Sequence, residues 1–244
     1  SNFRKRINKK IEMIRKYKYL TFIPARSGSK SIKNKNIQKI GKKSLIEISI
    51  NFAKKINSKN NYIFVSTDST KYSKIAKRAG AKVPFLRSKK YSKNNSNMVD
   101  AIFEFFQYIK IKKINLEFKY LIILMPTQPF RKISNINNGI KKLNKKFQTI
   151  LSIKNLNRPK DLIFEKNNNE INIKKKVTGS TNRQFVKSNY TPCGSFLITK
   201  LEVFKKSKSL YNNQIGFEET FFPYNLDIDK PFDLKLANLL LKKN

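Results

Sequence analysis

The chain has 244 residues, of which 39% are hydrophobic and 12% aromatic, so it is long and apolar enough to bury the core of one globular domain. It contains no histidine and a single cysteine, Cys193, which excludes catalysis by Ser-His-Asp or Cys-His groups, histidine metal sites and an intramolecular disulfide. Its 54 Lys and Arg residues against 15 Asp and Glu residues give a formal charge of +39, which favours anionic partners.

Residues 1–18 form a basic segment that we predict to be an appendage to the main domain. Ile7, Ile11 and Ile14 recur among basic residues at helical spacing, which predicts a short amphipathic helix over residues 3–16. The segment lacks the apolar stretch of a signal peptide, and no part of the chain approaches the roughly 20 consecutive apolar residues of a membrane span. Together with the single cysteine, this predicts a protein of the reducing cytoplasm with no membrane partner.

The next stretch, residues 19–36, reads YLTFIPARSGSKSIKNKN and predicts a strand followed by a ligand-binding loop. Residues 19–23 are aromatic and β-branched, as in a buried strand, and Pro24 ends the strand pairing. The loop after Pro24 combines cationic side chains, hydroxyl groups and Gly28, a combination that suits an oligophosphate. It has neither the spacing of a Walker loop nor that of G-x-G-x-x-G, so a solvated basic loop is the alternative at this stage.

Strands and helices then alternate along the first half of the chain. The first expected helix begins with the capping box of Ser44 and Glu47, and its apolar face carries Leu45, Ile48, Phe52 and Ile56. The other expected elements are strands over residues 62–66, 82–85 and 120–125, a short helix ending at Gly80, and a helix over residues 98–111. Repeated β-then-α order with near-continuous apolar strands predicts an α/β fold with a mainly parallel sheet that helices cover on both faces.

This alternation lapses between residues 156 and 189, where the sequence becomes rich in lysine and asparagine. Two short hairpin strands, over residues 162–165 and 170–173, are expected there, so the segment is predicted to be an arm that leaves the sheet. The core returns with a strand over residues 194–199, a helix over residues 201–206, a strand over residues 226–229 and a last helix beginning at Pro231.

Asp227 and Asp229 occupy alternate positions of the expected strand 226–229, a spacing that points both carboxylates to one side. Two neighbouring carboxylates repel each other unless a cation lies between them, and oxygen ligands suit Mg²⁺. We therefore predict that Asp227 and Asp229 bind Mg²⁺ together with phosphate oxygens of a nucleotide. Favouring the following helix N-terminus and pairing with lysine are the alternative roles.

The loop after Pro24 resembles the nucleotide-binding signature of the acylneuraminate cytidylyltransferases, enzymes that activate sialic acids and related nonulosonic acids as CMP-sugars. The family's Pro-Ala-Arg-x-Gly-Ser-Lys loop and the Lys-Asn pair that ends it are matched by Pro24, Ala25, Arg26, Gly28, Ser29, Lys30, Lys35 and Asn36. Ser27 and Ser31 stand where the family usually has glycine, and Lys33 where it often has proline. The resemblance implies that Ala25, Arg26, Ser29, Lys30, Lys35 and Asn36 bind the nucleotide, with Arg26 and Lys35 acting in catalysis beside Asp227 and Asp229.

Later segments resemble the same family in chain order. Residues 65–68 are similar to its V-S-T-D turn, residues 83–87 to a segment that ends in a nucleotide-contacting arginine, here Arg87, and residues 227–229 to its D-I-D. Residues 125–131 are similar to its Q-P-T-S-P-L-R, with Met125 in place of the glutamine and Gln128 in place of the serine. Taken singly, Asp68 could instead cap a helix, and Arg87 or Arg131 could face solvent.

The sugar site implied by this resemblance draws on several segments. Arg183 and Gln184 resemble the family's Arg-Gln pair, and Gly194 the glycine of its Asn-Gly, with Cys193 replacing the asparagine. The implied sugar contacts are Thr127, Gln128, Arg131, Arg183, Gln184 and Gly194. Cys193 has no histidine partner, so a small buried apolar role suits it better than that of a nucleophile.

The resemblance runs from about residue 20 to the C-terminus and implies one Rossmann-like nucleotidyltransferase domain over residues 19–244, with residues 156–189 as an inserted arm for dimerisation and sugar binding. It implies a homodimer that uses Mg²⁺ to transfer CMP from CTP to an acidic nine-carbon sugar, with release of pyrophosphate. Two alternatives are a nucleotide-binding homologue without catalysis and a basic nucleic-acid-binding protein. Lysines scattered along the whole chain, without a nucleic-acid module, favour an enzyme that binds no nucleic acid.

Overall fold

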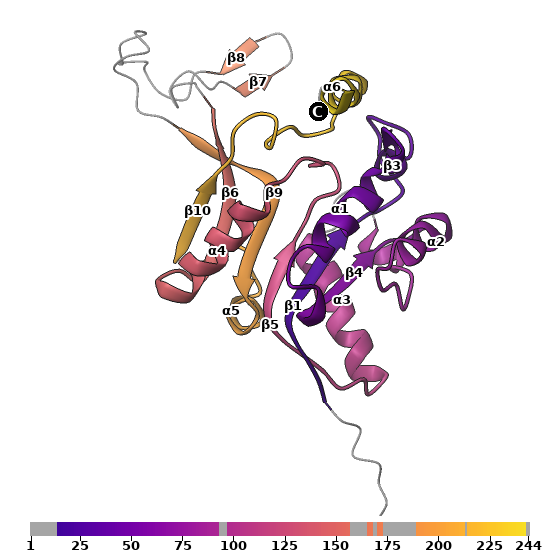
Figure 1. Ribbon diagram of the computed structural model, residues 1–244, viewed down its shortest axis with the longest axis vertical. Helices are drawn as coiled ribbons and strands as arrows, with labels where there is room; N and C mark the ends of the chain where they lie inside the picture. Colours follow the sequence, from indigo (N-terminus) through magenta and orange to yellow (C-terminus); the bar gives the residue numbers. More distant parts are fainter. Residues whose placement is uncertain are drawn as a thin grey trace, which may run out of the picture.

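A six-stranded sheet runs through the centre of the molecule. The computed structural model describes residues 14–92, 97–156, 165–167, 170–172, 189–212 and 214–242. In spatial order the strands are β10 (Ile215–Glu219), β6 (Thr149–Asn155), β9 (Tyr190–Lys200), β5 (Leu116–Ile123), β1 (Arg15–Pro24) and β4 (Asn61–Ser66) (Figure 1). Only β9 runs against its neighbours, since β1 pairs in parallel with β4 and β5, and β10 in parallel with β6. The predicted α/β fold with a mainly parallel sheet is therefore confirmed.

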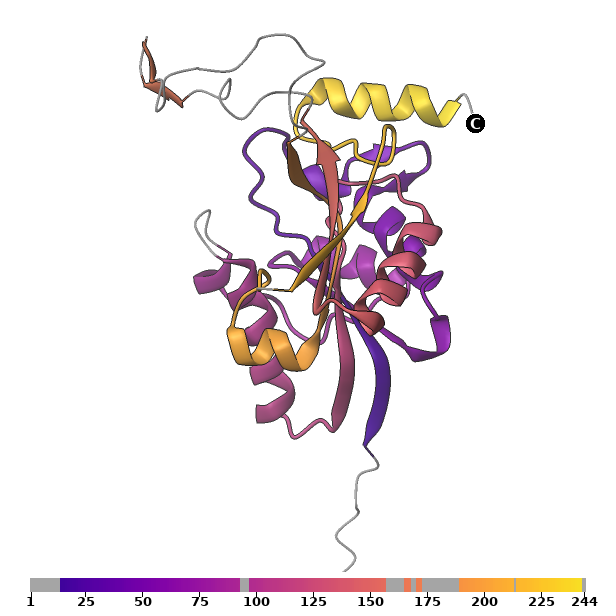
Figure 2. The ribbon, with the colours of Figure 1, turned by 90° about the vertical axis from the view of Figure 1, so that its left-hand side faces the viewer.

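Helices cover both faces of this sheet, as Figure 2 shows edge-on. One face carries α1 (Leu45–Lys54), α2 (Thr70–Arg78) and α4 (Ile133–Lys145), and the other carries α3 (Met98–Ile111) and α5 (Leu201–Ser207). A sixth helix, α6 (Pro231–Lys242), lies across the end of the sheet at the top of Figure 1. None of the helices in the described residues is long and apolar enough to span a membrane.

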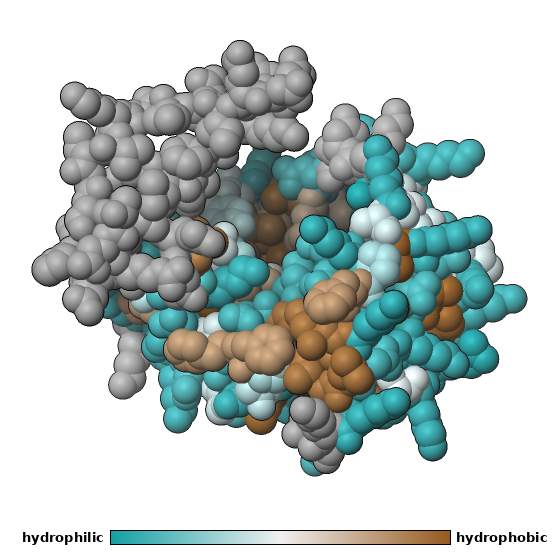
Figure 3. Space-filling view, turned by 90° about the horizontal axis from the view of Figure 1, so that it is seen from above, coloured by the Kyte–Doolittle hydropathy of each residue, from teal (hydrophilic) through white to brown (hydrophobic). Residues whose placement is uncertain are grey.

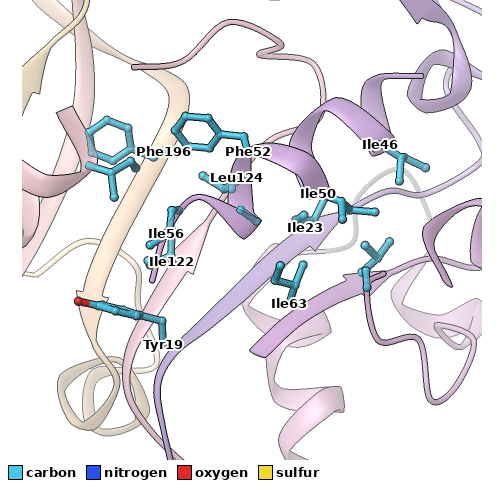
Figure 4. Close-up of a cluster of buried hydrophobic side chains, with 14 of the residues drawn as sticks. Tyr19, Ile23, Ile46, Ile50, Phe52, Ile56, Ile63, Ile122, Leu124 and Phe196 are labelled. Carbon is cyan, nitrogen blue, oxygen red and sulfur yellow. The ribbon is translucent and has the colours of Figure 1, made fainter. Parts of the chain in front are cut away.

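Alternate residues of β1 build two separate cores. Tyr19 and Ile23 join the cluster under α1, α2 and α4, part of which is drawn in Figure 4, whereas Leu20 and Phe22 join the cluster under α3 and α5. This two-residue period is what a strand buried on both faces requires. Thr21 is buried on the first face because its hydroxyl donates to the side-chain oxygen of Asn61, at 2.8 Å.

Local sequence signals position the first helix as predicted. Ser44 caps α1, since its side-chain oxygen accepts from the Glu47 backbone while the Glu47 carboxylate accepts from the Ser44 backbone at 2.8 Å, which completes the capping box. Ile56 lies beyond the end of α1, although it is buried, and Ile48 is only partly buried. The helical face is therefore shorter than expected.

Small elements complete the described chain. They are the short helices η1 (Lys35–Ile37), η2 (Ser58–Asn60) and η3 (Lys89–Tyr91), the hairpin of β2 (Lys39–Ile40) and β3 (Lys43–Ser44), and the hairpin of β7 (Glu165–Asn167) and β8 (Glu170–Asn172). The second hairpin lies in the predicted arm and matches the expected strand over residues 170–173. Its first strand lies later than expected, and residues 162–164 lie outside the described part of the chain.

Two predicted strands are wrong, and one predicted helix is wrong at its C-terminal end. The helix over residues 3–16 fails where it is described, because Arg15 and Lys16 belong to β1; residues 1–13 lie outside the described chain. Residues 82–85 form only one bridge, from Lys82 to Phe64, since Pro84 has no N–H to extend a ladder. Residues 226–229 form no strand, because their backbone N–H groups bond to loop carbonyls: that of Leu226 to Pro223 at 3.1 Å and that of Ile228 to Thr127 at 2.8 Å.

Candidate active site

The predicted site residues gather where the parallel strands end. β1, β4 and β5 all finish at this edge of the sheet, so the segments that follow them, residues 24–36, 66–69 and 124–131, meet there. The backbone bond from Ile228 to Thr127 brings the segment before α6 to the same place. Figure 3 looks down on this face, which is largely hydrophilic and is hollowed near its centre.

The loop after β1 is fastened at both of its ends. At its start, the backbone N–H of buried Ala25 donates to the carbonyl of Ser66 at the end of β4, at 2.8 Å. At its end, the side-chain amide of Asn36 donates to the carbonyl of Arg26, at 2.9 Å. The Lys-Asn pair therefore lies beside the arginine although nine residues of sequence separate Arg26 from Lys35.

The middle of this loop faces outward. Lys30 is exposed and Ser29 half-buried. A Cβ added to Gly28 would meet nothing within 4 Å, so the glycine leaves open space rather than filling a close contact. Such a loop, with backbone N–H groups and cations beside open space, has the donor set of an oligophosphate site.

Ser27 is held by Asp68, a carboxylate from the turn after β4. The Ser27 backbone N–H donates to Oδ1 of Asp68 at 2.8 Å, and the Ser27 hydroxyl donates to Oδ2 at 3.1 Å. Asp68 does not cap α2, because the side chain of Ser69 accepts from the backbone of Tyr72 and does so instead. The capping role considered for Asp68 is therefore wrong.

Arg87 is buried against the end of β4 rather than facing solvent. Its Nε donates to the Ser66 hydroxyl and its terminal nitrogen to the Ser66 carbonyl, each at 2.9 Å. Burial lowers the pKa of Arg87, the carboxylates of Asp68 and Glu104 oppose this shift, and the charge of Arg26 adds to it. Arg87 is therefore a buried cation whose hydrogen bonds hold it at the end of β4, beside the turn that carries Asp68.

Lys35 and the two predicted metal ligands form a charged group at the other side of the loop. The Lys35 ammonium, which is 9% exposed, lies 2.8 Å from Oδ1 of exposed Asp229. Burial raises the pKa of Asp227, and the Asp229 carboxylate raises it further, while Thr127, Gln128 and Lys35 oppose the shift. The two carboxylates therefore act on each other although no strand carries them.

The side chain of Gln128 is an unusual feature of this region. It is completely buried, and neither its amide nitrogen nor its oxygen makes a well-formed hydrogen bond among the described residues, although it lies close enough to the Asp227 carboxylate to lower the pKa of that group; Oδ1 of Asp227 is buried in the same way. Gly194 packs beside it with φ +76, and a Cβ there would lie 3.5 Å from Met125 and 3.8 Å from Gln128. Buried polar groups normally have partners, so this one has the character of a binding group.

Arg131 fastens the loop that carries Gln128. Its guanidinium donates to the Ser195 carbonyl at 2.7 Å, to the Ser49 hydroxyl at 3.3 Å and to the Met125 carbonyl. Burial lowers the pKa of Arg131 to about 9, which leaves it charged at neutral pH. The solvent-facing alternative is therefore wrong for Arg131 as well, and its hydrogen bonds show that it supports the loop that carries Gln128.

Sequence reasoning predicted most of this group of residues but missed one contact. The predicted residues that lie at this edge or support it are residues 25–36, Arg87, residues 127–131, Gly194 and the two aspartates. Arg183 and Gln184 lie outside the described residues. Asp68 was noticed only as part of a turn. The polar run of residues 66–69 directly after a buried strand was the signal that could have identified it.

The chemistry of the two aspartates suits a shared metal ion. Among the described residues, no group of three or more His, Cys, Asp or Glu side chains could hold a metal ion. Asp227 and Asp229 supply two oxygen ligands, one of them a buried oxygen without a partner. This set fits Mg²⁺, which commonly binds through one or two carboxylates together with phosphates and water.

Comparison with known proteins identifies the family. A family model described as cytidylyltransferase matches residues 20–243. The chain belongs to the cytidylyltransferase family. This cytidylyltransferase is 30% identical over 235 residues to the post-translational flagellin modification protein B of Campylobacter coli, covering 92% of this chain and 95% of that one.

Two other relatives carry names of nucleotide-sugar enzymes. The cytidylyltransferase is 30% identical over 233 residues to the CMP-N,N'-diacetyllegionaminic acid synthase of Campylobacter jejuni, covering 91% of this chain and 94% of that one. It is 26% identical over 229 residues to the N-acylneuraminate cytidylyltransferase of Escherichia coli, covering 93% of this chain and 52% of that one. The predicted membership of the acylneuraminate cytidylyltransferase family, and with it the nucleotidyltransferase activity, is confirmed.

Solved structures support the fold independently. A CMP:2-keto-3-deoxy-manno-octonic acid synthetase complexed with CTP matches the cytidylyltransferase with a TM-score of 0.65 at 14% identity, covering 93% of this chain and 99% of that one. The mixed, mainly parallel sheet is therefore of the nucleotidyltransferase type.

Proposed function

We propose that this cytidylyltransferase transfers CMP from CTP to a nonulosonic acid of the sialic acid type and releases pyrophosphate. The observation that carries the proposal is the convergence of the oligophosphate loop with Lys35, Asp227 and Asp229 at one edge of the sheet. The names of the relatives, which refer to diacetyllegionaminic, pseudaminic and acylneuraminic acids, support the substrate class.

Different residues of the loop and its surroundings bind different parts of CTP. Arg26, Lys30 and Lys35 hold the triphosphate by charge, and Ala25, Ser29, Asn36 and Arg87 complete the nucleotide site. The sugar hydroxyl attacks the α-phosphorus, a new phosphorus–oxygen bond forms, and the bond to the β-phosphate oxygen breaks as pyrophosphate leaves. The protein then contributes mainly orientation and neutralisation of charge on the phosphates.

Asp227 and Asp229 would hold Mg²⁺ beside the triphosphate. When bound, the ion polarises a phosphate and lowers the pKa of an oxygen ligand, which suits a chain without histidine. The Lys35 ammonium lies 2.8 Å from Asp229 and neutralises its charge, so it weakens the electrostatic repulsion between the two carboxylates.

We place the proposed sugar site on the side of Thr127, Gln128 and Gly194; Arg183 and Gln184, the further contacts that the resemblance implies, lie outside the described residues. The buried, unpartnered amide of Gln128 supplies the polar group that Met125 lacks. Arg131 positions this loop through its bonds to the Ser195 and Met125 carbonyls. A site that must fill the hydrogen bonds of a buried amide discriminates strongly against substrates that lack the matching group.

A pyrophosphate-release assay tests this function. Each of the four common nucleoside triphosphates is offered with Mg²⁺, with and without a panel of nonulosonic acids. We expect release only with CTP and only with an acceptor acid. CTP binding without release would identify a catalytically silent homologue, and indifference to CTP with salt-sensitive binding to duplex DNA would identify a nucleic-acid-binding protein.

We further propose that the cytidylyltransferase is a cytoplasmic homodimer whose arm, residues 156–189, contacts the second subunit. The proposal rests on the break in strand and helix alternation there and on the hairpin of β7 and β8, which pairs with no strand of the central sheet. Light scattering at the concentration of the activity assay is expected to give twice the mass of the chain. A fully active monomer would contradict the dimer.

A further inference from the structure

The contact between Ser27 and Asp68 joins the middle of the phosphate loop to the neighbouring strand. It spans 41 residues of sequence and uses both oxygens of the Asp68 carboxylate, one for the backbone N–H and one for the hydroxyl of Ser27. Hydrogen bonds with an ionised acceptor are stronger than neutral ones. Ser27 lies between Arg26 and Gly28. Holding Ser27 in place therefore also restrains the backbone of both neighbours.

Among the described residues, few other hydrogen bonds restrain this part of the loop. The bonds of Ala25 and Asn36 act at its two ends, and within residues 27–31 the remaining backbone bond runs from the Ser29 N–H to the Ser27 carbonyl, at 2.9 Å. The orientation of the exposed segment over residues 28–31 therefore depends on where Ser27 is held. A loop that is already ordered loses less conformational entropy when a ligand binds.

The position of Asp68 among cations supports a role at the site. The charge of Asp68 raises the pKa of the buried Arg87 guanidinium, and the charge of Arg26 lowers it. A carboxylate so near a triphosphate site would repel phosphate if it were free to turn toward it. The two bonds from Ser27 instead direct the carboxylate oxygens into the loop backbone.

We propose that Asp68 and Ser27 are positioning residues, which set the triphosphate-binding conformation of the loop before CTP arrives. The inference rests on the proposed function, because it names what orients that loop. Asp68 and Ser27 touch the loop rather than the reacting atoms, so their loss changes the affinity for the oligophosphate and leaves acceptor binding unaltered. The Ser27 hydroxyl serves this chain where glycine would supply only the backbone bond.

The test compares Ser27→Ala, Ser27→Thr and Asp68→Asn with the wild type. Calorimetric titration with CTP and with inorganic triphosphate is expected to show a Kd about fivefold higher for Ser27→Ala and about tenfold higher for Asp68→Asn. Ser27→Thr keeps the hydroxyl and is expected to stay within about twofold of wild type. In steady-state assays the KM for CTP rises with the Kd, while the KM for the acceptor acid is unchanged.

Ser69→Ala is the matched control, because it removes a hydroxyl that caps α2 one residue after Asp68. It is expected to lower Tm without changing the Kd of CTP. Folded Ser27→Ala and Asp68→Asn proteins that bind CTP as tightly as wild type would overturn the inference. So would a rise in the KM for the acceptor equal to that for CTP, which is the mark of a general structural defect.

Hydrogen exchange over residues 25–36 in the ligand-free protein separates this inference from the proposed function. Faster exchange of the Ser27 amide in Asp68→Asn than in wild type is expected, and equal exchange would contradict the positioning role whatever the ligand is. If wild type bound neither CTP nor triphosphate, the proposed function would fail, and the exchange result would still decide whether Asp68 orders the loop.

Discussion

Asp227 is kept in a place that disfavours its ionised form. Burial and the neighbouring Asp229 raise its pKa, and its Oδ1 has no hydrogen-bond partner among the described residues. A carboxyl group whose pKa is raised on folding binds its proton more tightly in the native state than in the unfolded state. Its ionisation therefore destabilises the native state: the stability that its proton contributes is fully present below the unfolded pKa and is lost as pH rises through the native pKa.

Asp227→Asn is therefore expected to stabilise the protein while it removes activity. At neutral pH we expect Tm to rise by about 2 °C, because the amide needs no ionisation, and turnover to fall by about 100-fold or more. Calorimetry between pH 4 and pH 8 should show the difference in Tm growing as pH rises.

Asp100→Asn is the control for this substitution. Asp100 is exposed in the first turn of α3, where a negative charge favours the helix, so its removal should lower Tm slightly and leave turnover unchanged. A lower Tm for Asp227→Asn at neutral pH would contradict the account given for Asp227. Near-normal turnover of the folded variant would remove Asp227 from the catalytic site.

At the scale of elements, the sequence predicted best where a local signal coincided with burial. The helix Met98–Ile111 was predicted with its observed bounds because apolar residues recur at helical spacing and Ala101, Ile102, Phe105 and Ile109 are buried on one side. The strand after Asn61 was predicted because both of its faces are apolar. In these segments local preference and tertiary packing favour the same structure.

Prediction failed where a strand needed a partner that the sequence does not name. Residues 226–229 have the two-residue alternation of a strand, and Ile228 is indeed buried between Asp227 and exposed Asp229, but among the described residues the Ile228 N–H bonds to the Thr127 carbonyl of a loop and not to a strand. The start of β1 was missed for the opposite reason. Its basic residues are not typical of a strand, yet Tyr17 packs against Tyr62 and Phe118, and residues 15–17 extend the pairing of β1 with β5.

For the site, the sequence predicts the residue types of the loop but not the contacts that depend on the fold. The residue types of the loop after β1 predict a phosphate ligand, because glycine, hydroxyl groups and cations bind phosphate in many proteins. The hydrogen bonds that Ser27 donates to Asp68 were not predictable, since a contact across 41 residues depends on which strands lie side by side. The unpartnered amide of Gln128 was likewise visible only once burial was known.

At the scale of the whole molecule, the positive charge is largely uncompensated. Of the 54 Lys and Arg residues, the described part of the chain pairs three with a carboxylate within 4 Å: Lys16 with Glu117, Lys35 with Asp229 and Lys142 with Glu218. Such a field attracts any anion over a distance of about 10 Å at 0.1 M salt, and added salt screens it. A specific phosphate site differs because its contacts are short and partly withdrawn from water.

The last prediction separates the loop from this general field. Arg26→Ala and Lys30→Ala are each expected to raise the KM for CTP by about tenfold or more, both at about 0.05 M and at about 0.5 M salt, because close contacts to phosphate are screened less than distant charges. The matched control is the double variant Lys110→Ala with Lys112→Ala, two exposed lysines at the C-terminal end of α3. It removes more charge than either loop variant but leaves the loop intact. We expect the control to raise the KM by about twofold at low salt and to have no effect at high salt. Equal losses from the loop variants and the control, vanishing together as salt is added, would show that CTP is held by the diffuse field of the protein and not by the loop.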